Sequence, residues 1–252
     1  MNSYRTYDWG RVYQGDSFQL MEDLIQGGRK FPLQIHDPPY EVSAPNVSRS
    51  NGGGDLVLDF GEWDKLPDLE KMVKLWTGVA SEDASILVFF NNWDEYSSLK
   101  KLLNQEGWKV DALVWTKTNP APQVRRRSYV TAFELILWAR RGTYTFNFTQ
   151  HTEMFSWRSS PIAMGHVRLK GADGKTLHPT QKPVKLIESY IRDLSNPGDE
   201  VLDCFAGALT TAAACILQGR KFIVCEQEEK YVKLGCEWLE DLQEKNRSLK
   251  PT

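Results

Sequence analysis

The chain has 252 residues, of which 41% are hydrophobic and 25% charged, and its formal net charge is −2. This size and composition fit one large α/β domain with an insertion, and they exclude a disordered chain. No apolar run has the length of a membrane span, and the first residues lack a secretory signal, so we expect a cytoplasmic protein that does not bind membranes. The four cysteines show no C-x-x-C spacing, which favours free thiols in a reducing compartment.

Short apolar runs recur along the chain with helical patterns between them. The runs lie at residues 12–13, 33–36, 85–90, 110–115, 133–138, 200–203 and 221–225. Continuous apolar runs of this length are typical of strands that are buried on both faces. Apolar positions with helical spacing predict helices near residues 184–194 and 231–242. The alternation predicts an α/β fold with a doubly wound, mostly parallel sheet.

A proline turn follows the 33–36 run, with the sequence Asp37-Pro38-Pro39-Tyr40. Two consecutive prolines fix φ twice and remove two backbone donors. The groups that remain are acceptors, namely the Asp37 carboxylate and the Pro38 carbonyl, beside the aromatic ring of Tyr40. Acceptors next to a stacking surface suit a planar ring that carries an NH₂ group, such as adenine or cytosine.

Two long segments break the alternation of strands and helices. Residues 41–67 contain three consecutive glycines, and we interpret them as a mobile loop. Residues 142–177 show no clear periodicity and are basic, and we interpret them as an inserted recognition region. Between Lys117 and Lys182 there are eleven basic and three acidic residues, a charge of +8 that leaves −10 for the rest of the chain. A basic middle between acidic flanks is typical of a protein that binds a polyanion.

A second motif runs from Asp203 to Thr211, between a predicted strand and an alanine-rich helix. A strand, a turn of small residues and a helix N-terminus form a common binding site for a nucleoside-bearing cofactor. The next predicted strand ends about twenty residues later at Glu226, whose carboxylate can accept hydrogen bonds from two ribose hydroxyls.

Together these motifs resemble those of the DNA amino-methyltransferases, over about residues 9–240. Asp37-Pro38-Pro39-Tyr40 matches the catalytic motif of that family, and residues 203–211 match part of its cofactor motif. Residues 178–183, His-Pro-Thr-Gln-Lys-Pro, match its helix-start motif. The catalytic motif precedes the cofactor motif, which is similar to the permuted β arrangement of the family. Leu209 is a departure, because the family usually has glycine at that position.

The resemblance implies transfer of a methyl group from S-adenosyl-L-methionine to a flipped-out base in double-stranded DNA. The acidic first residue of the catalytic motif favours the N6 amine of adenine. N4-cytosine methylation, an inactive DNA-binding homologue, and methylation of RNA or of a small molecule remain alternatives. A cognate restriction endonuclease is a candidate partner.

The resemblance also assigns site residues. The expected catalytic residues are Asp37, Pro38, Pro39 and Tyr40. The expected cofactor-binding residues are Asp16, Ser17, Thr180, Lys182, Asp203, Phe205, Ala206, Gly207 and Glu226, with Thr180 and Lys182 near the carboxylate of the cofactor. The residues expected to contact DNA are Lys117, Asn119, Arg125, Arg126, Arg127, Arg158, Arg168 and Lys170. No metal is expected, because the histidines and cysteines lack metal-ligand spacing, and His36 is interpreted as structural or DNA-facing.

Overall fold

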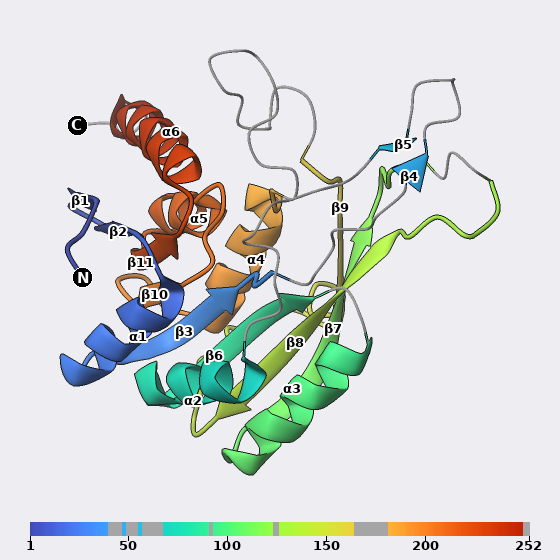
Figure 1. The fold of residues 1–252 in the computed structure, drawn as a ribbon, viewed down its shortest axis with the longest axis horizontal. Helices are drawn as coiled ribbons and strands as arrows, with labels where there is room; N and C mark the ends of the chain where they lie inside the picture. Colours follow the sequence, from blue (N-terminus) through green and yellow to red (C-terminus); the bar gives the residue numbers. More distant parts are fainter. Residues whose placement is uncertain are drawn as a thin grey trace.

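A central nine-stranded sheet with helices on both faces forms the body of the protein (Figure 1). The structure is a computed structural model, and it describes residues 1–39, 47–48, 55–56, 68–90, 93–122, 126–163 and 181–248. The sheet strands are β1 (Arg5–Tyr7), β2 (Gly10–Gln14), β3 (Phe31–His36), β6 (Ala80–Phe90), β7 (Lys109–Lys117), β8 (Phe133–Arg141), β9 (Trp157–Ser160), β10 (Glu200–Asp203) and β11 (Lys221–Glu226). The helices are α1 (Ser17–Gln26), α2 (Leu69–Val79), α3 (Trp93–Gln105), α4 (Val184–Leu194), α5 (Thr210–Gln218) and α6 (Glu229–Ser248).

The strand order is β1-β2-β11-β10-β3-β6-β8-β7-β9. The pairings from β2 to β6 are all parallel, whereas β8 is antiparallel to both of its neighbours and β1 is antiparallel to β2. The prediction of a mostly parallel α/β sheet is therefore confirmed. Parallel strands need crossover helices, which explains why their apolar runs alternate with helical patterns in the sequence.

Two hydrophobic cores lie on opposite faces of the sheet. Helices α1, α2 and α3 cover one face, and their largest buried side chain is Trp76. Helices α4, α5 and α6 cover the other face, where small side chains of α5 pack against the sheet. Because both faces are covered, the central strands are buried on both sides, as their continuous apolar runs predicted.

The β3 strand is central and nevertheless contains Pro32, which has no N–H to donate to the ladder. Its pairing with β6 shifts register between Phe31 and Leu33, at the position of this proline. A bulge is the usual way for a sheet to accept proline. The regular pairing resumes at Leu33 and continues to His36, so the end of β3 is in regular register with β6.

The structure adds strands that the sequence patterns did not predict. β9 lies within the predicted recognition region, and it extends the sheet beside β7. Within the predicted loop 41–67, β4 (Val47–Ser48) pairs with β5 (Asp55–Leu56), and the rest of that loop lies outside the described residues. All four cysteines are buried and unpaired, as predicted. Among the described residues, no helix is long and apolar enough to cross a membrane.

Candidate active site

The carboxyl ends of the parallel strands bring the two sequence motifs to one edge of the sheet. β10 is hydrogen-bonded to β3 on one side and to β11 on the other, so the turns after Asp203, His36 and Glu226 are neighbours. The neighbour of β11 on its other side is β2, where Gln14 pairs with Glu226. In open α/β sheets, ligands bind at this edge.

His36 connects the two motifs through its buried ring. Its Nδ1 accepts a hydrogen bond from the backbone N–H of Cys204 at 3.3 Å, so its Nε2 carries the proton and donates to Gln34 Oε1 at 3.1 Å. The ring also stacks on Trp76 with 5.0 Å between centroids. Burial lowers the pKa of His36 to about 3, so the ring stays neutral and keeps this pattern at physiological pH. His36 is thus structural, which was one of its two predicted roles.

Asp37 follows His36 directly, and its carboxylate is held by a lysine from another part of the chain. The Lys182 ammonium donates to Asp37 Oδ2 at 2.5 Å and lies 3.4 Å from Glu134 Oε2. Pro38 and Pro39 belong to the described turn, whereas Tyr40 lies outside the described residues. The sequence motifs placed Lys182 near a cofactor carboxylate, and in the structure its charge is directed at Asp37.

Asp203 shapes the turn between β10 and α5. Its Oδ1 accepts a hydrogen bond from the Phe205 N–H at 2.9 Å, and its Oδ2 accepts one from the Thr211 hydroxyl at 2.6 Å. Burial raises the pKa of this carboxyl to about 7. The residues Phe205, Ala206 and Gly207 therefore form a defined curve at the strand end.

Glu226 lies beside this turn at the end of β11. Its Oε2 accepts the Gly207 N–H at 2.8 Å and its Oε1 accepts the Glu228 N–H at 2.9 Å. A carboxylate has about four lone-pair sites, so these bonds leave acceptor capacity for a ligand. Burial raises the pKa of Glu226 to about 7, which makes its charge sensitive to pH near neutrality. Asp16 follows β2, the strand next to β11, and caps α1 by accepting the Gln19 N–H. Ser17 is the first residue of that helix.

Leu209 stands at a position where the family usually has glycine, but its side chain points away from the turn at Phe205–Gly207. It adopts a left-handed conformation with φ 59° and ψ 30°, and it is completely buried. Its side chain packs into the core against α6, where a Cβ on Gly235 would lie 2.5 Å from Leu209 Cγ. The missing side chain of Gly235 thus makes room for Leu209. α5 begins after Leu209 with no side-chain cap, so its first backbone N–H groups are not satisfied by a capping side chain.

Three residues that were predicted to contact DNA are engaged within the chain. Lys117 pairs with Glu134 at 2.8 Å, the Asn119 side chain accepts the Ile162 N–H at 2.7 Å, and Arg158 pairs with Asp193. Arg126 and Arg127 are exposed. The remaining members of the predicted DNA set, Arg125, Arg168 and Lys170, lie outside the described residues, as does the predicted cofactor residue Thr180.

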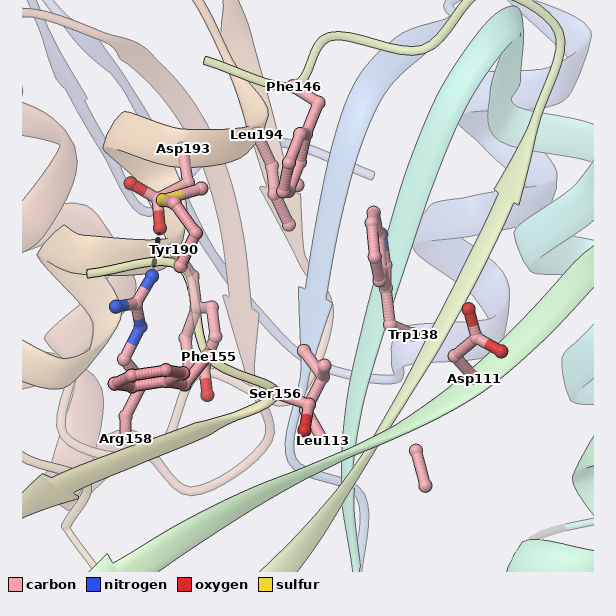
Figure 2. Close-up of a pocket in the computed structure, with 12 residues that line it drawn as sticks. Asp111, Leu113, Trp138, Phe146, Phe155, Ser156, Arg158, Tyr190, Asp193 and Leu194 are labelled. Atoms are coloured by element: carbon pink, nitrogen blue, oxygen red, sulfur yellow. Dashed lines mark hydrogen bonds and ion pairs between the residues drawn. The ribbon is translucent and has the colours of Figure 1, made fainter. Parts of the chain in front are cut away.

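A cavity of about 300 Å³ lies between α4 and strands β7 and β8 (Figure 2). Trp138, Phe146 and Phe155 contribute aromatic walls, and the Arg158–Asp193 ion pair lies at one side. Asp37, Asp203 and Glu226 do not line it. The cavity is therefore separate from the strand-end site.

The structure singles out two residues, in and beside the site, that the sequence analysis did not name. Glu134 enters it at the start of β8, where it contacts both Lys182 and Lys117. A glutamate near the start of an otherwise apolar run was a signal that could have been used. Gly235 lies in the core beside the site, where it makes room for Leu209, and its signal was a glycine inside a helical pattern. Among the described residues, no group of three His, Cys, Asp or Glu side chains is arranged to hold a metal ion.

Comparisons with known proteins agree on one family. A family model described as "DNA methylase", of N6 and N4 methyltransferases, matches residues 32–237. The type II methyltransferase M2.DpnII of Streptococcus pneumoniae is 33% identical over 249 residues, which cover 93% of this chain and 91% of that protein. The type II methyltransferase M2.LlaDCHI of Lactococcus lactis subsp. cremoris is 32% identical over 238 residues, 89% of this chain and 87% of that protein.

Solved structures agree with the fold. The M1.HpyAVI–SAM complex has 27% sequence identity and a TM-score of 0.73, covering 91% of this chain and 98% of that one. The PvuII DNA methyltransferase, titled cytosine-N4-specific, has a TM-score of 0.69 over 96% of this chain and 95% of that one. At 19% identity, the second likeness shows a shared fold only.

The contact between Leu209 and Gly235 predicts coupled effects on stability. Leu209→Gly removes left-handed strain of about 1–2 kcal/mol but leaves a buried void, for a net loss of about 2–3 kcal/mol in the free energy of unfolding. Gly235→Ala alone should cost about 1–3 kcal/mol, because the new methyl overlaps Leu209. In the Leu209→Gly background, Gly235→Ala should cost less than half as much. Urea unfolding of the four proteins measures this, and additive losses would contradict the packing described here.

Proposed function

Since the chain belongs to the N6/N4 DNA methylase family, we propose that it transfers a methyl group from S-adenosylmethionine to the N6 amine of adenine in double-stranded DNA. One observation carries the proposal. The hydrogen bond between Cys204 N–H and His36 joins the turn that presents Asp37 to the turn that begins at Asp203. Asp37, which would accept the hydrogens of the target amine, therefore lies on the same sheet edge as the turn that would hold the nucleoside.

The residues at this edge fit S-adenosylmethionine. The Glu226 carboxylate would accept the ribose hydroxyls, and the turn at Phe205, Ala206 and Gly207 would hold the methionine end, next to the uncapped N-terminus of α5. Asp16 and Ser17, on the neighbouring strand end, would lie near the adenine. When bound, the cofactor supplies a methyl group on a positively charged sulfur, a good electrophile. The likeness to the M1.HpyAVI–SAM complex supports this cofactor.

Asp37 would activate the target amine by accepting its hydrogens. The lone pair of an aromatic NH₂ is delocalised into the ring, which makes the nitrogen a poor nucleophile. Hydrogen bonds to the Asp37 carboxylate and to the Pro38 carbonyl draw the nitrogen toward tetrahedral geometry and localise that lone pair. Pro38 and Pro39 keep these acceptors rigid, because their φ angles are fixed. Tyr40 would stack on the flipped base.

The acidic first residue of the proline turn favours adenine over cytosine as the target base. N4-cytosine methylation is the alternative. An inactive DNA-binding homologue is less well supported, because the side chain of Leu209 is directed into the core against α6 and so leaves the turn at Phe205–Gly207 unobstructed.

The remaining expectations concern DNA. We propose that residues 142–177 contribute to recognition and that the exposed Arg126 and Arg127 contact phosphates together with Arg125. Most of the expected loop at residues 41–67 lies outside the described residues. Arg168 and Lys170 belong to the same proposed DNA surface. The permuted β arrangement, a cytoplasmic location and a cognate restriction endonuclease are further parts of the proposal.

Incubation of random-sequence duplex DNA with labelled cofactor, followed by nucleoside analysis, tests the proposed function. We expect label in N6-methyldeoxyadenosine from the DNA, and no label in single-stranded RNA of matched composition. Label in N4-methyldeoxycytidine would establish the alternative. No label in DNA, from a protein that binds the cofactor, would identify an inactive homologue.

Replacement of the acceptor tests the catalytic assignment. Asp37→Ala should lower kcat for DNA methylation by at least about 100-fold, because a preorganised charged acceptor is lost. The dissociation constant for S-adenosylmethionine should change by less than about threefold. Steady-state methylation and calorimetric titration measure the two quantities. Retention of more than about a tenth of the wild-type kcat would remove Asp37 from the catalytic role.

The raised pKa of Glu226, about 7, predicts a pH dependence of cofactor binding. Ribose hydroxyls donate to the ionised carboxylate, so below pH 7 the free protein must release a proton before binding. Affinity should therefore be constant above about pH 8 and fall toward tenfold per pH unit below pH 7. Glu226→Gln should bind more weakly at pH 8 and lose most of this dependence. Calorimetric titrations between pH 5.5 and 8.5 measure both profiles, and equal slopes for the two proteins would place the ribose elsewhere.

A further inference from the structure

Four side chains of alternating charge form a connected row beside the proline turn. Asp37 contacts Lys182 at 2.5 Å, Lys182 contacts Glu134 at 3.4 Å, and Glu134 contacts Lys117 at 2.8 Å. The row crosses from the end of β3 to the start of β8 and the end of β7. It contains two carboxylates and two ammonium groups, so its formal charges cancel.

Lys182 is the buried member of this row. Its side chain is only 8% exposed, compared with 21% for Asp37 and 18% for Glu134. Its ammonium also lies 5.2 Å from the centre of the Phe89 ring, and its backbone carbonyl accepts the Thr210 hydroxyl at 3.3 Å. The residue is thus fixed at both ends, by the start of α5 at the backbone and by two carboxylates at the ammonium.

An ammonium in such a place needs compensation. Burial alone lowers the pKa of Lys182, but Asp37 and Glu134 more than offset this effect and raise the pKa above its ordinary value. The same contacts act on Glu134, where burial raises the pKa and the charges of Lys182 and Lys117 lower it overall. Lys182 and Glu134 are therefore both ionised at neutral pH, and removal of one charge from the row leaves a buried neighbour without its partner.

We propose that Lys182 is a positioning residue for Asp37, and that Glu134 holds Lys182 in place for this task. The proposal rests on the proposed function and replaces the expected role of Lys182 at the cofactor carboxylate. The ion pair fixes the rotamer of Asp37 and favours its ionised form, in which both carboxylate oxygens can only accept hydrogen bonds.

A carboxyl group on the neighbouring strand acts on Asp37 in the opposite direction. Asp203, at the end of β10, is near enough for the charge of Asp37 to contribute to its raised pKa. Without Lys182, Asp37 would face Asp203 and Glu134, and both of these carboxyls would disfavour its ionised form. His36, the adjacent residue, is neutral and directed into the core. Among the described residues, Lys182 is therefore the cation that favours the ionised form of Asp37.

The test follows the titration of Asp37 without DNA or cofactor. In protein labelled with ¹³C at aspartate carboxyl carbons, the Asp37 signal is assigned by its absence from Asp37→Asn. In Lys182→Met, which keeps the length of the side chain without its charge, we expect the Asp37 midpoint to rise by at least about one pH unit. Lys185→Met is the matched control, because Lys185 is an exposed lysine three positions later, in α4. The Asp37 midpoint in this variant should equal that of the wild type.

Activity and binding measurements complete the test. In Lys182→Met, kcat should fall by at least about 30-fold and its acid limb should move to higher pH, whereas the dissociation constant of S-adenosylmethionine should change by less than about threefold. Glu134→Gln should lower kcat by about tenfold alone and by less than about twofold in the Lys182→Met background, because it acts through Lys182.

Three outcomes would overturn the proposal. These are an unchanged Asp37 midpoint in Lys182→Met, a loss confined to cofactor affinity, and additive effects of the Glu134 and Lys182 substitutions. The second outcome would return Lys182 to the cofactor carboxylate. If the wild type fails to methylate DNA, the proposed function fails, while the carboxyl titration still decides whether Lys182 controls Asp37.

Discussion

The buried imidazole of His36 is the constraint on which the geometry of the site depends. Its two ring nitrogens bind Gln34 of its own strand and the Cys204 N–H of the neighbouring turn. Gln34 in turn donates to the Trp76 carbonyl at 2.9 Å, which ties the arrangement to α2. Because Asp37 follows His36 directly, the same ring fixes the turn after β3, which contains Asp37, relative to the turn after β10. Burial keeps the ring neutral, so a change of pH within the physiological range does not disturb this link.

Carboxyl groups at this edge are held in two physically different ways. Asp203 and Glu226 accept hydrogen bonds from backbone N–H groups, and burial raises the pKa of each to about 7. Asp37 instead has an ammonium beside it, which favours its ionised form. A ligand that donates hydrogen bonds to Glu226 has to displace its proton at low pH, whereas the carboxylate of Asp37 is paired with the Lys182 ammonium. Neighbouring groups with different charge behaviour can therefore serve binding and chemistry separately.

The sequence predicted the parts of the site that depend on local patterns. Apolar runs located the seven main strands, and the carboxyl ends of parallel strands necessarily share an edge, so Asp37 and Glu226 could be placed near each other. Pairings between distant residues could not be predicted. Lys182 and Asp37 are 145 positions apart in the chain, and nothing in the spacing of either motif shows that their side chains meet. The orientation of Leu209 also escaped prediction, because it depends on a left-handed backbone and on the missing side chain of Gly235. Lys117 and Arg158 counted as basic residues in a basic region, although their charges are used in ion pairs within the chain.

A crystal structure of the protein with a stable analogue of S-adenosylmethionine tests the central claim most directly. The claim is that one sheet edge holds both the cofactor and the acceptor of the target amine. The account predicts that the ribose hydroxyls lie within about 2.6–3.2 Å of the Glu226 carboxylate, and that the methyl-bearing end of the analogue faces Asp37. An analogue bound away from Glu226, for example in the cavity between α4 and strands β7 and β8, would contradict it.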